Sequence, residues 1–80
     1  MIRREEVERF ADAMERKLQA NDHKGGWKHD LAMSLLPRLR QEVQELTRAV
    51  GEGTEEDILN EAADVANFAM MVADVCGGLK

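Results

Sequence analysis

All six glycines of this 80-residue sequence fall in three short clusters, which divide the chain into three segments. The clusters are Gly25-Gly26, Gly51-Glu-Gly53 and Gly77-Gly78. Glycine favours turns and helix ends because it reaches backbone conformations that are costly for other residues. The segments between the clusters are rich in the helix formers Ala, Leu, Glu, Met, Arg and Lys, and the chain has one proline and no tyrosine. We therefore expect an all-α chain of three helices.

The first helix is expected from about residue 2 to residue 20, followed by a loop over residues 21–26. Its apolar residues recur at helical spacing and predict one buried stripe. That stripe comprises Val7, Phe10, Ala11, Met14 and Leu18.

The second helix is expected to begin with Ser34 as its N-cap, since a serine hydroxyl can accept a hydrogen bond from a first-turn amide. Pro37 is tolerated there because first-turn amides have no acceptor within the helix. The cluster at residues 51–53 should close this helix. Its expected buried side comprises Leu35, Leu39, Val43, Leu46 and Val50.

The third helix is expected from Thr54, as N-cap before an acidic first turn, to about Cys76. The short turn that precedes it predicts an antiparallel helix hairpin. Cys76 should be a small buried apolar residue. The expected buried side comprises Ile58, Ala62, Val65, Ala69, Val72 and Cys76.

The size of the chain predicts a single domain, residues 1–80, with a modest core. One cysteine excludes an internal disulfide, so a metal or a partner chain is the available support. The third helix is also apolar over a wide arc, which favours an interface. We expect at least a homodimer with a four-helix-bundle-like core, or a dimer of dimers. That arc comprises Leu59, Val65, Phe68, Met71, Val72 and Val75.

The net charge of −5 argues against a partner that is a nucleic-acid polymer, because such surfaces are basic. No apolar run reaches the roughly 18 residues that a membrane span needs, so we expect no membrane partner. The N-terminus is charged from its third residue, unlike a secretory signal. With the free thiol, this predicts a cytoplasmic protein.

Four carboxylates account for most of the acidic surplus. Glu61 and Asp64 lie on or beside the apolar side of the third helix, where a carboxylate is costly unless it is paired, protonated or bound to a metal. Glu42 and Glu45 share one face of the second helix. Across a hairpin the two pairs can meet as an all-oxygen site suited to Mg²⁺ or Mn²⁺. The alternatives are ordinary surface acids, or pairing with Arg38, Arg40 or Arg48.

These residues resemble a known family. The run Arg38-Leu-Arg-Gln-Glu42-Val-Gln-Glu45-Leu46, followed by Glu61-Ala-Ala-Asp64-Val-Ala-Asn67-Phe68, is similar to the MazG-like branch of the all-α nucleoside triphosphate pyrophosphohydrolases. The upstream run Lys17-Leu-Gln-Ala-Asn21-Asp-His-Lys24-Gly-Gly-Trp27 also resembles small phage and bacterial members. The resemblance covers roughly residues 17 to 76.

The resemblance implies Mg²⁺-dependent hydrolysis of standard or modified (d)NTPs to the monophosphate and pyrophosphate, a nucleotide-pool house-cleaning activity. It implies Glu42, Glu45, Glu61 and Asp64 as metal ligands, one of which could also activate water. It also favours a homo-oligomer. From a different class, the competing interpretation is a non-catalytic helical adaptor that dimerises through the third helix, or an inactive family member.

Four further residues are candidates for binding substrate, each with a structural alternative. Trp27 can stack on a nucleobase or cap the core, and Lys24 can reach phosphate oxygens or be solvated. Asn21 is a weaker candidate in the same loop, and Asn67 could bind sugar, base or a metal-bound water, or be a polar surface residue. The two histidines and one cysteine lack the spacing of a zinc site.

Overall fold

The computed structural model describes residues 2–80 and consists of three α-helices and one short 3₁₀ turn, with no strand in that range. The elements are α1 (Glu5–Ala20), η1 (Asp22–Lys24), α2 (Ala32–Glu52) and α3 (Glu55–Val75). The expectation of an all-α, three-helix chain is confirmed. Within the described residues, no helix is both long and apolar enough to cross a membrane.

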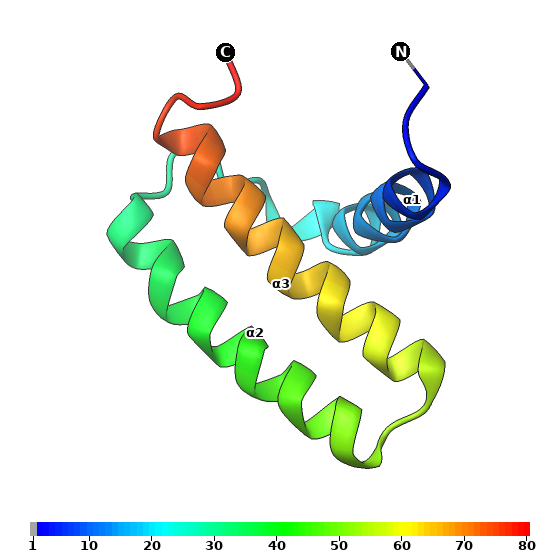
Figure 1. Ribbon diagram of the computed structural model, residues 1–80. Helices are drawn as coiled ribbons and strands as arrows, with labels where there is room; N and C mark the ends of the chain where they lie inside the picture. The colour runs from blue at the N-terminus through cyan, green and yellow to red at the C-terminus, as the bar shows by residue number, and fades with distance from the viewer. Residues whose placement is uncertain (1) are drawn as a thin grey trace.

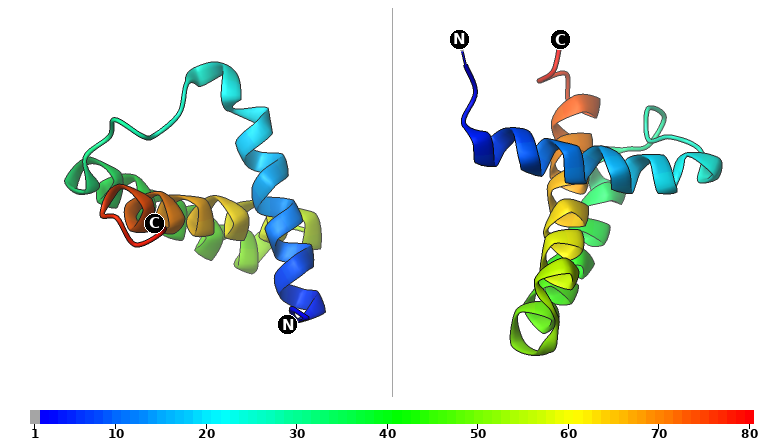
Figure 2. Two further views of the ribbon diagram at one scale, coloured as in Figure 1. Left: turned by 90° about the horizontal axis from the view of Figure 1, so that it is seen from above. Right: turned by 90° about the vertical axis from the view of Figure 1, so that its right-hand side faces the viewer.

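Helices α2 and α3 lie side by side along their lengths, and α3 returns along α2 after the turn at Gly53-Thr54 (Figure 1). Within residues 2–80, α3 is the long helix that α1 packs against, and α1 runs across the α2–α3 pair rather than along it (Figure 2). The end of α1 therefore lies near the middle of α3, and the loop that follows it reaches the last turn of α3. This arrangement leaves a recess bounded by α1, the loop and the α2–α3 pair.

Helix α1 begins at Glu5 rather than near residue 2. Arg4 is its N-cap in an extended conformation, and Glu5, Glu6 and Glu8 occupy the first turn. A helix N-terminus carries partial positive charge, which favours these glutamates and disfavours arginines within the first turn.

Helix α2 begins three residues earlier than expected: its N-cap is Leu31 rather than Ser34, and its first helical residue is Ala32. The Leu31 carbonyl accepts hydrogen bonds from the amides of Ser34 and Leu35, so Ser34 lies inside the helix and does not cap it. Pro37 consequently sits beyond the first turn, where it deprives the Met33 carbonyl of an intrahelical donor.

The N-terminus of α3 is as expected. Thr54 Oγ1 accepts from the Asp57 amide at 3.1 Å, and Asp57 Oδ2 accepts from the Thr54 amide at 3.0 Å, which completes a capping box. Gly53 is the C-cap of α2, and a β-carbon there would lie 2.9 Å from the Ala49 carbonyl oxygen. The tight α2–α3 turn thus requires glycine at this position.

The buried faces differ from the expected stripes in several places. The buried apolar residues are Ala13, Leu35, Ala49 and Ala63, and three of these four are small. Close helix packing favours alanine because larger side chains would hold the backbones apart. Several residues expected to be buried are exposed instead: Val7, Ala11, Val43, Val50, Ala69 and Cys76.

Candidate metal and nucleotide site

Three of the four predicted carboxylates meet between α2 and α3. Each of Glu42, Glu61 and Asp64 offers a carboxylate oxygen, and these oxygens lie within 4.8 Å of one another. All three side chains are half-buried. Glu61 and Asp64 are three residues apart on α3, so they project from the same face toward Glu42. An all-oxygen set of this kind is suited to a hard divalent cation such as Mg²⁺ or Mn²⁺.

Glu45 lies outside this carboxylate triad. Its Oε2 accepts from Arg48 Nη1 at 3.3 Å, within α2. Glu45 and Glu61 instead border a second, smaller recess toward the α2–α3 turn. Of the arginine pairings considered above, the described residues contain this one alone.

The electrostatics of the triad are unfavourable to three simultaneous negative charges. The pKa of Glu42 is raised from its ordinary value, first by burial and then by repulsion from Asp64, Glu61 and Glu45. Lys17 opposes this shift, and its Nζ lies 3.4 Å from Asp64 Oδ2. Lys17 comes from the last turn of α1, so the crossing of α1 over α3 brings one cation to the edge of the triad.

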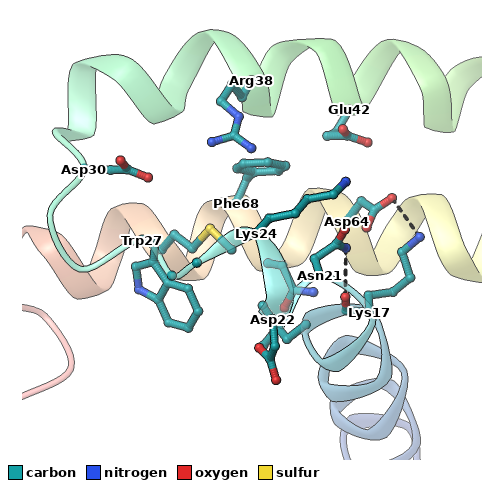
Figure 3. Close-up of a pocket in the computed structure, with 15 residues that line it drawn as sticks. Lys17, Asn21, Asp22, Lys24, Trp27, Asp30, Arg38, Glu42, Asp64 and Phe68 are labelled. Atoms are coloured by element: carbon teal, nitrogen blue, oxygen red, sulfur yellow. Dashed lines mark hydrogen bonds and ion pairs between the residues drawn. The ribbon is translucent and has the colours of Figure 1, made fainter.

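A cavity of about 390 Å³ adjoins the triad and contains all four predicted substrate-binding residues in its lining. Lys24 extends from the loop across the cavity toward its carboxylate end (Figure 3). Asn21 ends α1, and its Nδ2 donates to the Lys17 carbonyl at 2.9 Å. Trp27 stands at the opposite end of the cavity, half-buried (Figure 3).

Asn67 is not a surface residue. It is 4% exposed, and its Nδ2 donates to the Met14 carbonyl of α1 at 3.0 Å. Its Oδ1 is buried and has no hydrogen-bond partner in the structure. A buried, unpaired carbonyl oxygen beside the cavity is a costly feature unless it meets a ligand or a water.

Arg38 and Phe68 also line the cavity, although the sequence did not predict either of them as a site residue. The Arg38 guanidinium lies 4.6 Å from the centre of the Phe68 ring, a cation–π contact between α2 and α3. Arg38 precedes Glu42 by one helical turn, and Phe68 follows Asp64 by one turn. That spacing of four residues was the available signal, because it places each pair on one helix face.

Asp74 makes a second contact that the sequence did not indicate. Its Oδ2 accepts from Trp27 Nε1 at 2.8 Å and from Lys28 Nζ at 2.6 Å. These hydrogen bonds, first that from Lys28 and then that from Trp27, lower the pKa of Asp74 from its ordinary value. Trp27 therefore joins the loop to the end of α3.

Comparison of the chain with models of protein families, with curated proteins and with solved structures gave no significant match.

Proposed function

We propose that this chain is a Mg²⁺-dependent nucleoside triphosphate pyrophosphohydrolase of the MazG-like type, which removes standard or modified (d)NTPs from the nucleotide pool. The observation that carries the proposal is the carboxylate triad, defined by Glu42, Glu61 and Asp64, at the edge of a cavity lined by cationic and aromatic side chains. A metal-bound polyphosphate needs acidic ligands for the ion and basic groups for the remaining phosphate charge. This cavity combines the two.

The donor set fits a magnesium ion. Three carboxylates would hold it, and its remaining positions suit water and phosphate oxygens. Glu45, the fourth carboxylate implied by the family resemblance, lies one helical turn from Glu42 and would join only after leaving Arg48. When bound, the ion would supply charge neutralisation at the phosphates.

The side chains along the cavity would have different roles toward the phosphates, the base and the attacking water. Lys24 and Arg38 would contact phosphate oxygens, and Trp27 would stack on the base. A triad oxygen that does not hold the ion would accept a proton from the attacking water. The water oxygen forms a bond to one of the two phosphorus atoms that share the α–β bridging oxygen, and the bond from that phosphorus to the bridging oxygen breaks. The bridging oxygen leaves with the other phosphate group, and the products are the monophosphate and pyrophosphate.

We further propose that the antiparallel α2–α3 hairpin assembles into a homodimer or a dimer of dimers. The isolated chain exposes 6249 Å². A compact monomer of 9.0 kDa exposes only about 4,900 Å². The excess is larger than the roughly 800 Å² that each partner buries in a standard interface.

The same excess surface supports a competing function, a non-catalytic helical adaptor. That interpretation accounts for the exposed valines of α2 but gives no reason for a carboxylate triad between two packed helices. Substituting Glu61 by leucine would be neutral or stabilising in an adaptor. In the enzyme, the same substitution would abolish turnover.

The test measures pyrophosphate and monophosphate release across a panel of standard and modified NTPs and dNTPs with Mg²⁺. The variants are Glu61→Gln and, as a matched control, Glu15→Gln on the exposed face of α1. We expect release by the wild-type protein and by the control, and at least a hundredfold loss in Glu61→Gln, as for removal of a charged transition-state contact.

Magnesium binding is measured in parallel as a rise in the melting temperature at millimolar Mg²⁺, since a ligand of the folded state stabilises it. No release from any nucleotide, with no Mg²⁺-dependent rise, would contradict the metal site and favour the adaptor. A Mg²⁺-dependent rise in the control that is absent in Glu61→Gln would uphold the site, whatever the nucleotide.

A further inference from the structure

The loop of residues 21–30 forms one wall of the cavity, yet little holds it there. It supplies about half of the residues around the cavity, including Lys24 and Trp27. Among the described elements, its η1 turn contacts α1 and no other, and the glycines at 25 and 26 have open space around them. A wall of this composition has few apolar contacts to keep it closed, which is typical of segments that open easily.

Within the described part of the chain, two hydrogen bonds join this loop to a helix that is distant in the sequence. Both of them end on the same acceptor atom. That atom is Asp74 Oδ2, which accepts from Trp27 Nε1 and from Lys28 Nζ. Lys28 Nζ also lies 5.4 Å from the centre of the Trp27 ring. The three side chains thus form one connected cluster.

Asp74 itself is poorly placed for the stability of its own helix. It lies in the last turn of α3, which has no basic residue, and a helix C-terminus disfavours negative charge. Its partners come entirely from the loop, 46 and 47 residues earlier in the chain. The hydrogen bonds of this carboxylate therefore hold the loop in place and do not stabilise the C-terminal turn of α3.

Asp74 is also separate from the cavity, because it does not belong to the cavity lining. Any influence on a ligand must pass through Trp27 and the loop backbone. We propose that Asp74 is a positioning residue that clasps the Trp27 loop against the end of α3 and thereby sets the affinity of the cavity for its nucleotide. The link to a nucleotide rests on the proposed function, whereas the clasp rests on the contacts of Asp74.

Trp27 makes the clasp directly observable. It is the only tryptophan and the chain has no tyrosine, so tryptophan emission reports on this one ring. The experiment compares emission and acrylamide quenching in the wild type, Asp74→Ala, Asp74→Asn and Asp12→Asn. Asp12 is exposed on α1, so its substitution makes the same charge change without touching the loop.

We expect Asp74→Ala to shift the emission to the red and to raise the quenching constant about twofold, because the indole gains water contact on losing its acceptor. Asp74→Asn retains an oxygen that can accept from Trp27 Nε1 but loses the charge that holds Lys28. Its emission maximum and quenching constant should therefore fall between those of the wild type and those of Asp74→Ala. Asp12→Asn should match the wild type. Helix content from circular dichroism establishes that each variant is folded.

The second measurement uses the nucleotide that the wild type hydrolyses fastest. We expect Asp74→Ala to raise KM about tenfold and to change kcat by less than about twofold, as when binding is lost equally from ground and transition states. Asp74→Asn should recover part of the affinity. A variant that merely loosened the fold would instead lose activity together with helix content.

Emission and quenching in Asp74→Ala that equal those of Asp12→Asn would overturn the clasp. A change in emission with an unchanged KM would overturn the positioning role. If the wild type hydrolyses no nucleotide, the proposed function fails, and the emission comparison then upholds or overturns the clasp without it.

Discussion

Glu42 lies where charge repulsion among the triad carboxylates opposes folding. Burial first, and then repulsion from Asp64, Glu61 and Glu45, raises its pKa. A carboxyl whose pKa is higher in the folded state favours folding at low pH, and this contribution is lost as the pH rises through the folded-state pKa. Without a cation, the ionised triad should therefore weaken the fold at neutral pH, where Lys17 offsets only part of the repulsion.

We predict that Glu42→Gln raises the melting temperature by a few degrees in EDTA at pH 7, because it removes one of the repelling charges. The same substitution should abolish the stabilisation by millimolar Mg²⁺. Thermal unfolding followed by circular dichroism, with and without Mg²⁺, measures both effects. The gain in EDTA should also shrink as the pH is lowered, because the wild-type carboxyl takes up a proton when the pH falls through its raised pKa.

Glu15→Gln is the control, since this glutamate is exposed on α1 and lies outside the triad. A Glu42→Gln protein that is less stable than the wild type in EDTA would show that Glu42 makes a net favourable contact. The repulsion argument would then be wrong.

At the scale of elements, the loop between α1 and α2 depends on two adjacent glycines with different backbones. Gly25 has a φ of +87°, in the left-handed region that L-residues rarely adopt, while Gly26 lies outside that region. A β-carbon would meet nothing within 4 Å at either position. Alanine substitutions at the two positions therefore differ in backbone strain but not in steric contact.

We predict that Gly25→Ala destabilises the protein by about 1 kcal/mol, because alanine is strained at positive φ. Gly26→Ala should be neutral or stabilising by up to about 1 kcal/mol, because it restricts only the unfolded chain. Urea unfolding of the two variants measures the difference. Equal stability of the two would argue that the loop does not hold the Gly25 conformation in solution.

At the scale of the whole molecule, part of the exposed apolar surface lies on one side of α2. Val43 is 45% exposed and Val50 is 63% exposed. They are seven residues apart, so they share one side of the helix, next to the buried face that contains Leu35. The radius of gyration of 13.2 Å also exceeds the roughly 12 Å of a compact domain of this length.

We predict that the wild-type chain sediments as a dimer or tetramer and that the double variant Val43→Lys/Val50→Lys shifts it toward the 9.0 kDa monomer. Lysines desolvated in an apolar interface oppose association. Gln41→Lys/Gln44→Lys is the control, because both glutamines are exposed on the same helix. Equal sedimentation of the two double variants would place the interface elsewhere.

The sequence by itself determined the helices and their breaks. Helical spacing, glycine clusters and the Thr54–Asp57 capping box act over a few residues, so their effect can be read locally. The spacing of Glu61 and Asp64 likewise put both carboxylates on one face of α3 before any packing was known. The start of α2 was misplaced because the backbone carbonyl of Leu31, rather than the side chain of Ser34, accepts the first-turn amides.

Only the tertiary structure decided which side chains meet. The crossing of α1 over α3 brings Lys17 to Asp64 and the Met14 carbonyl to the side-chain amide of Asn67. The packing of α3 on α2 brings Glu42 into the triad and leaves Glu45 to Arg48. The return of the loop joins Trp27 to Asp74. These contacts span up to 53 residues, and their geometry depends on how whole helices pack, which no local pattern encodes.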